Sequence, residues 1–236
     1  MPVDQAKTAP FDAHHERYER WFDKHQAAYV SELLALRTLV PCEGRGLEVG
    51  VGTGRFAGPL GIAVGLDPSN AMLARAAERG VEVVQGVAEA LPFSDGSFDH
   101  VLIVTAICFA NSPEKMLEEA RRVLRPGGGL VIGFVDRETP LGQAYLEHRS
   151  ESVFYREATF FSSAEVHALL SAQGFVVRAS GQTLFRPLAE TTEVEAMRSG
   201  TGDGAFVVLA SGVDSGASAN RIEAEVRAAT NGSATL

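Results

Sequence analysis

The chain has 236 residues and a formal net charge of −9 at pH 7, and 45% of its residues are hydrophobic. This length and composition fit one α/β domain with an accessory segment. The acidic balance argues against a nucleic-acid substrate, because neutralising phosphates requires a concentrated basic face. The longest apolar stretch, Val101 to Ala110, is about ten residues, well short of the roughly twenty that span a bilayer.

The N-terminus and the cysteines bear on location and on metal binding. Residues 1–7 lack the basic start and the apolar core of a secretory signal. The two cysteines, Cys42 and Cys108, are far apart in the sequence and have no paired spacing. They therefore indicate neither a disulfide framework nor a zinc knuckle. We expect a cytoplasmic protein without a metal site.

The first forty residues have the apolar spacing of one amphipathic helix. Because such a helix needs a surface to cover, residues 1–40 are expected to form a helical lid segment on a main domain at 41–212. The apolar residues that recur at three- and four-residue spacing are Tyr18, Trp21, Phe22, Tyr29, Leu33, Leu36 and Val40.

A glycine loop with Gly50, Gly52 and Gly54 follows a short buried strand expected at residues 47–49. Glycine can take positive φ values, and its missing Cβ lets a ligand come close to the backbone. The dinucleotide fingerprint places its third glycine three residues after the second, where this chain has Arg55. The following residues also allow only a short helix, so the loop suits a nucleoside cofactor without phosphates.

The rest of the main domain alternates between strand and helix signals, as in a parallel α/β fold. Ser69 is the expected N-cap of a helix through Arg79, and Ser112 is the N-cap of the next helix. Ser162 and Glu165 form a capping box for a third helix. Strands are expected at residues 62–66, 81–85, 98–105, 130–135, 175–179 and 205–210.

Five motifs in register resemble those of a known family. They are Leu47–Gly54, Gly65–Ser69, Gly86–Phe93, Ser97–Val101 and Arg122–Gly128. They resemble the class I S-adenosylmethionine-dependent methyltransferases, in the type 11 branch that includes the ubiquinone and menaquinone C-methyltransferases. The resemblance implies a Rossmann-like, doubly wound sheet of about seven strands, mostly parallel with an antiparallel last strand, and helices on both faces.

By this resemblance, Gly50, Gly52 and Gly54 would approach the methionine part of the cofactor, S-adenosyl-L-methionine. Glu48 would lie near its amino group. Asp67, followed by Pro68, would accept both ribose hydroxyls, because the two oxygens of one carboxylate match a vicinal diol.

The resemblance also places Met72 on the adenine face and Ala88 and Glu89 at the adenine edge. A purely structural role stays open for each of these side chains, and a turn or capping role stays open for Asp67. Thr105 is a further pocket candidate, because it is polar at the end of an apolar strand.

The sequence does not assign a catalytic residue. Tyr18, Thr105 and Tyr155 are candidates for contact with the acceptor, and for Cys108 inert packing is favoured over reactivity. Residues 136–161 are expected to be an insertion on the substrate side, and residues 213–236 a flexible tail with a short helix at 221–229. Four histidines could act as a base but have no partner at a recognisable spacing: His14, His15, His25 and His100.

Three functions stay open at this point. The first is methyl transfer to a small molecule, and the second is regulation by a non-catalytic S-adenosylmethionine-binding protein. The third, an NAD-linked oxidoreductase, needs another glycine spacing. The stretches Thr105–Phe109 and Ser152–Tyr155 resemble a bacterial subgroup labelled as related to histamine N-methyltransferase, but no spacing shows an amine site. The sequence does not predict an oligomeric state.

Overall fold

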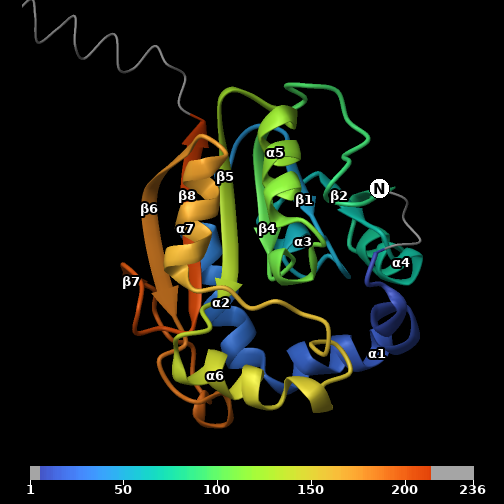
Figure 1. Cartoon of the computed structure of the whole chain (residues 1–236). Coiled ribbons are helices and arrows are strands. Elements are labelled where there is room, and N and C mark those ends of the chain that lie inside the picture. Colours follow the sequence, from blue (N-terminus) through green and yellow to red (C-terminus); the bar gives the residue numbers. More distant parts are fainter. Residues whose placement is uncertain (1–5, 214–236) are drawn as a thin grey trace, which may run out of the picture.

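The computed structural model describes residues 6–213 of the chain. Its centre is an eight-stranded sheet with the order β3-β2-β1-β4-β5-β8-β6-β7 (Figure 1). Strands β3, β2, β1, β4 and β5 are parallel, whereas β8 runs antiparallel to both β5 and β6. The strands are β1 (Gly46–Val49), β2 (Val64–Asp67), β3 (Glu82–Gln85), β4 (Phe98–Val104), β5 (Leu124–Val135), β6 (Phe175–Thr183), β7 (Arg198–Ser199) and β8 (Phe206–Val213).

Helices cover both faces of the sheet, so the predicted Rossmann-like fold is confirmed. On one face, α5 (Pro113–Val123) and α7 (Ser163–Ala172) bury their apolar side chains in one core cluster. On the other face, α2 (Gln26–Leu39), α3 (Ala57–Leu60) and α4 (Asn70–Glu78) contribute to a second cluster. Figure 1 shows α5 and α7 in front of the sheet and α2 behind it. The strand order reverses between β1 and β4, which opens a crevice at their carboxyl ends.

The predicted helix ends are confirmed by their capping bonds. The hydroxyl oxygen of Ser69 accepts a hydrogen bond from the backbone N–H of Met72, and that of Ser112 accepts one from Lys115. Ser162 and Glu165 form both bonds of the capping box. These short-range signals work because the first backbone N–H groups of a helix have no partner within the helix.

The single helix expected over the first forty residues is wrong. The chain forms α1 (Ala9–Lys24) and α2, separated by His25 at φ −115° and ψ 46°. The two helices cover different surfaces, since α1 packs on α4 and α2 packs on β5, β6 and β8. The apolar spacing runs through the break, so it could not reveal the change of direction.

Other boundaries also differ from those expected. Strand β5 begins at Leu124 rather than near 130, and four residues bulge out of its pairing with β4, between Leu124 opposite Phe98 and Gly129 opposite His100. The insertion at 136–161 contains α6 (Pro140–Glu147), capped by Thr139. Two short 3₁₀ turns flank the cavity described below at Ile107–Phe109 and Arg149–Glu151. The tail from 214 onward, with the helix expected at 221–229, lies outside the described residues.

Within residues 6–213, none of the helices combines the length and the apolar character needed to cross a membrane.

Candidate active site

A cavity of about 480 Å³ lies at the carboxyl ends of β1, β2, β4 and β5. Pockets for small ligands commonly have volumes of roughly 300 to 1,000 Å³. Side chains of α1 form one wall of the cavity, and residues 145–155 form another. Most of the residues proposed for the cofactor and the acceptor line it together: Tyr18, Gly50, Gly52, Asp67, Pro68, Met72, Ala88, Glu89, Thr105 and Tyr155.

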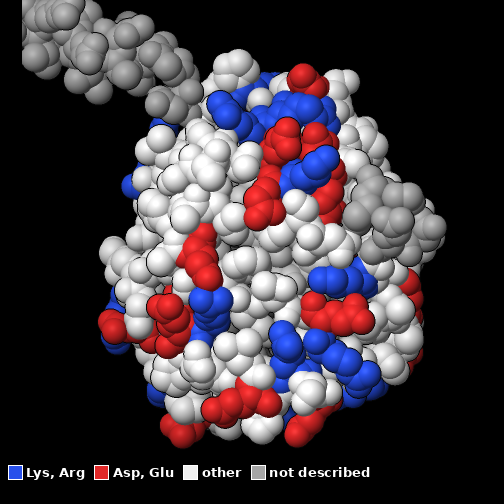
Figure 2. Space-filling model, in the orientation of Figure 1, with Lys and Arg blue, Asp and Glu red and all other residues white. Residues whose placement is uncertain are grey.

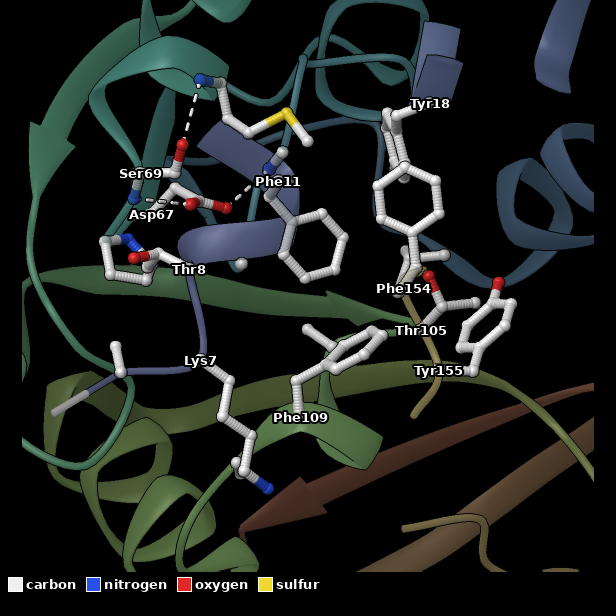
Figure 3. Close-up of a pocket in the computed structure, with 18 of the residues that line it drawn as sticks. Lys7, Thr8, Phe11, Tyr18, Asp67, Ser69, Thr105, Phe109, Phe154 and Tyr155 are labelled. Atoms are coloured by element: carbon white, nitrogen blue, oxygen red, sulfur yellow. Dashed lines mark hydrogen bonds between the residues drawn. The ribbon is translucent and has the colours of Figure 1, made fainter. Parts of the chain in front are cut away.

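Asp67 is the last residue of β2, and only 9% of its surface is exposed. Its Oδ2 accepts a hydrogen bond of 2.9 Å from the backbone N–H of Gly52, and its Oδ1 accepts one of 2.9 Å from Ser69 (Figure 3). Burial raises the pKa of Asp67 to about 6, against the lowering effect of these two bonds. Because each carboxylate oxygen can accept about two hydrogen bonds, both keep capacity for the hydroxyls of a ribose.

The glycines of the loop have different roles: two of them line the cavity, and the third packs against a helix. Gly50 and Gly52 line the cavity at φ +75° and +52°. A Cβ at Gly50 would lie 2.5 Å from the Cβ of Ala106, so a larger residue does not fit there. Gly54 does not line the cavity; its Cβ would lie 3.0 Å from the Cα of Ala76 in α4. Gly54 therefore permits close packing of α4, and its predicted approach to the cofactor stays a prediction.

Glu48 lies in β1 with 1% of its surface exposed, and it does not line the cavity. Burial raises its pKa well above the usual value, and the nearby charge of Asp67 adds to this effect. Within the described part of the chain, its Oε2 atom has no hydrogen-bond partner. Because Glu48 does not line the cavity, its predicted place near the amino group of methionine stays a prediction.

The residues predicted to lie beside the adenine are an apolar side chain and a carboxylate with a structural role. Met72 is 1% exposed and lines the cavity. Glu89 lines it as well, but its Oε1 accepts hydrogen bonds from the backbone N–H groups of Asn111 at 2.7 Å and Ser112 at 3.3 Å. Glu89 therefore also holds the start of α5, a structural role that the sequence left open.

Aromatic rings fill the other half of the cavity. Figure 3 shows Phe11 between Asp67 and Ser69 on one side and Tyr18 and Phe154 on the other. The Phe154 ring centroid lies 5.3 Å from that of Phe11 and 5.9 Å from that of Tyr18. Phe109 and Phe154 lie in the segments 105–109 and 152–156, where the sequence predicts an aromatic acceptor pocket, and both line the cavity. Phe11 and Tyr145 line it too but were not predicted individually, because their spacing in the sequence looks like ordinary core packing.

An ion-pair network holds α1 against the glycine loop and α4. The Glu19 carboxylate accepts hydrogen bonds from Arg55 at 2.6 and 3.0 Å and from Arg79 at 2.7 Å. These interactions lower the pKa of Glu19 in spite of its partial burial. Nearby, the Ser69 hydroxyl donates to Asp12 of α1. These contacts hold α1 at the cavity wall, and its role as a lid stays a prediction.

Thr105 takes the left-handed φ of +50° directly after β4. This conformation is unusual for a β-branched residue and places local backbone strain at the cavity wall. Its N–H donates to the carbonyl of Gly133 at 2.8 Å, and the Cys108 thiol donates to its carbonyl at 3.0 Å. Burial raises the pKa of Cys108 to about 12, so this thiol remains protonated and packs as an apolar group.

None of the four histidines proposed as a base lines the cavity: His14, His15, His25 and His100. His100 is buried, and burial lowers its pKa, so it is neutral within the sheet. Among residues 6–213, no group of histidine, cysteine or acidic side chains has the arrangement of a metal site.

Comparison with known proteins identifies the fold and the cofactor. A family model described as a methyltransferase domain matches residues 47–132. The structure is similar to that of a Thermotoga maritima protein described as an S-adenosylmethionine-dependent methyltransferase and possible histamine N-methyltransferase. The TM-score is 0.86, with 48% identity over 88% of this chain and 100% of that one. The chain belongs to the S-adenosylmethionine-dependent methyltransferases of type 11.

Other relatives carry different descriptions. An uncharacterized protein of Methanocaldococcus jannaschii is 44% identical over 84% of this chain and 96% of its own length. A malonyl-[acyl-carrier protein] O-methyltransferase of Methylococcus capsulatus is 32% identical over 66% of this chain and 61% of its own length. Membership of the family establishes S-adenosyl-L-methionine as the cofactor of this enzyme, and the acceptor must be argued from the cavity.

Proposed function

We propose that this enzyme transfers a methyl group to a small-molecule acceptor held beside the cofactor in the cavity at the strand ends. One observation carries the proposal: the carboxylate of Asp67 and the aromatic rings of Tyr18 and Tyr155 line the same cavity. A cavity of about 480 Å³ that also holds a nucleoside leaves room for a small acceptor only.

The bound cofactor supplies an electrophilic methyl group on a positively charged sulfur. In our proposal Asp67 binds the ribose hydroxyls, Gly50 and Gly52 face the methionine part, and Met72 packs on the adenine. The chain then has to align the acceptor and exclude water. Alignment of two reactants can contribute roughly 7 to 11 kcal/mol to catalysis. Tyr18 and Phe11 supply aromatic faces, which attract a nearby cation.

The surface supports a small molecule rather than a nucleic acid. On the face shown in Figure 2, acidic and basic side chains are interspersed and form no continuous basic surface. Several arginines are already paired, since Arg122 binds Asp95 and Glu119 and Arg137 binds Glu165. Binding of a phosphate backbone depends on basic side chains that are free to neutralise it.

Incubation with methyl-labelled S-adenosylmethionine tests the proposal. Amines, thiols, phenols and quinols are offered separately, and transfer of label to at least one class is expected. The Asp67→Ala variant should transfer much less label at the same cofactor concentration. If every class fails while S-adenosylhomocysteine still binds, the proposal is wrong, and a non-catalytic S-adenosylmethionine-binding regulator is favoured.

A further inference from the structure

Glu32 of α2 is a buried carboxyl group whose environment indicates a role in ligand binding. It is 5% exposed and lines the cavity together with Tyr18, Tyr145 and Tyr155. Within residues 6–213, its carboxyl group takes part in no hydrogen bond or ion pair, in agreement with burial as the cause of its pKa shift. A charged group in such a place is unfavourable unless something binds it.

A second buried glutamate shows what a purely structural carboxylate looks like in this fold. Glu195 is 7% exposed, and its two oxygens accept hydrogen bonds from the backbone N–H of Phe185 and from the Arg186 guanidinium at 2.8 Å. Glu32 has no corresponding donors. Burial alone raises the pKa of Glu32 to about 8.

Phenol and phenyl rings line the same cavity as Glu32. The Tyr145 and Tyr155 ring centroids lie 5.3 Å apart, and the Phe109 ring stacks on Tyr155 at 6.0 Å. Tyr145 lines the same cavity as Glu32, and burial first, then the Glu32 charge, raise the pKa of Tyr145. Tyr18 and Tyr155 are raised in the same way, with burial first and Glu32 among several contributing groups. All three phenols are therefore neutral near pH 7. Glu32, with a pKa of about 8, is mostly protonated there in the ligand-free enzyme and can ionise when a cation binds beside it.

A carboxylate surrounded by aromatic rings has the chemistry of a site for an organic cation. The carboxylate accepts hydrogen bonds from an ammonium group, and the ring faces attract its charge. Because the rest of the cavity wall is apolar, the bound cation should also carry an apolar group. An anionic or strongly polar acceptor would leave Glu32 without a partner.

We propose that Glu32 binds the ammonium group of the acceptor, which is a small primary amine on an aromatic-sized apolar body. This inference rests on the proposed methyl transfer and adds the class of substrate. In the same contact, Glu32 can accept a proton from the ammonium group. When one N–H proton moves to a Glu32 oxygen, the nitrogen keeps its electron pair and the carboxylate becomes a neutral acid.

Calorimetric titration of the enzyme saturated with S-adenosylhomocysteine tests the inference. The probes are 2-phenylethylamine, histamine and 2-phenylethanol, the last being a neutral match for the first. Both amines should bind, and 2-phenylethanol should bind about 10- to 150-fold more weakly than 2-phenylethylamine, as expected for one charged hydrogen bond. At pH 7, amine binding should release close to one proton per site, because Glu32 is protonated before the amine arrives.

Two variants assign the effect to a residue. Glu32→Gln should bind 2-phenylethylamine no better than 2-phenylethanol and should release no proton, with its affinity for S-adenosylhomocysteine unchanged. Glu43→Gln removes an exposed carboxylate and should behave as wild type. Glu151→Gln removes an exposed carboxylate at the cavity wall and should also retain amine binding.

The inference is overturned if wild type binds 2-phenylethylamine and 2-phenylethanol equally, or if it binds neither amine. It is also overturned if Glu32→Gln loses binding of S-adenosylhomocysteine and keeps binding of the amine. The same holds if Glu151→Gln, rather than Glu32→Gln, is the variant that loses amine binding. The comparison of amine and alcohol in wild type needs no variant to fold. If S-adenosylhomocysteine itself does not bind, the proposed function fails, and that result is separate from all of these.

Discussion

The carboxylate of Asp67 is fastened to the glycine loop, because its Oδ2 accepts a hydrogen bond of 2.9 Å from the backbone N–H of Gly52. This bond joins the end of β2 to the turn after β1. The group proposed to bind the ribose and the loop proposed to face the methionine are therefore fixed relative to each other. A loop held before the ligand arrives loses less conformational freedom on binding.

Affinity for S-adenosylhomocysteine should depend on pH through Asp67. Ribose hydroxyls donate to the ionised carboxylate, and burial raises the pKa of Asp67 to about 6 in the free enzyme. Binding therefore favours loss of the proton, and affinity should fall as pH falls below 6. We expect about tenfold weaker binding at pH 5 than at pH 7.5, measured by calorimetry. In Asp67→Asn this step near pH 6 should disappear; its persistence there would contradict the assignment.

Gly50 and Gly61 form a matched pair for testing the loop. Their φ values are +75° and +73°, but a Cβ at Gly50 meets Ala106 at 2.5 Å, whereas one at Gly61 meets nothing within 4 Å. Gly61→Ala should lose about 1 to 2 kcal/mol of unfolding free energy through backbone strain alone. Gly50→Ala should lose roughly 1 to 3 kcal/mol more, through overpacking. Only Gly50→Ala should lose S-adenosylhomocysteine binding; equal effects on both measurements would contradict the close approach at Gly50.

The docking of α1 should depend on Glu19. Its carboxylate binds Arg55 and Arg79, and its side chain is 18% exposed. Allowing for solvent screening, Glu19→Gln should weaken this docking by about 1 to 2 kcal/mol. Faster amide exchange in residues 9–24 and faster release of S-adenosylhomocysteine are expected. Glu16→Gln on the same helix, whose partner Arg20 lies 3.9 Å away at the surface, is the control and should change neither rate. Unchanged exchange in Glu19→Gln would mean that α1 is held by its apolar contacts.

Glu32 should make stability depend on pH. Its pKa is 4.5 in the unfolded chain and about 8 in the folded one, so between these values the native state binds more protons than the unfolded state. Stability of the ligand-free wild type should therefore fall as pH rises through this window. Glu32→Gln lacks the penalty and should be more stable than wild type, by up to about 5 kcal/mol above pH 8 and by far less at pH 5. Urea unfolding at pH 5 and pH 8.5 measures this, and a difference that does not change with pH would count against a buried, ionising Glu32.

Local signals in the sequence predicted much of the fold. Helix starts are predicted by residues that bond to the nearby backbone, such as Ser69 and the pair Ser162 and Glu165. The same local logic misses the break at His25, because apolar spacing continues through it. It also misses the bulged start of β5, since Pro126 and the following glycines read as a turn.

Residues of the site that belong to a sequence motif could be predicted. Those brought to the cavity only by helix packing could not. The loop glycines and Asp67 follow from their spacing and the family resemblance. Glu32 does not, because a single glutamate on an amphipathic helix usually faces water. Only the packing of α2 against β5 and β8 turns that residue toward the cavity. Phe11 is hidden for the same reason, since its role depends on where α1 lies.

Calorimetric titration of wild type and Asp67→Ala with S-adenosylhomocysteine tests the cofactor site most directly. Hydrogen bonds to an ionised acceptor contribute roughly 1.5 to 3 kcal/mol each, so the variant should bind about one to four powers of ten more weakly. Circular dichroism should show the same fold for both proteins, and Asp95→Ala, which removes an exposed carboxylate outside the cavity, should bind as wild type. Wild-type affinity in a folded Asp67→Ala variant would contradict the account.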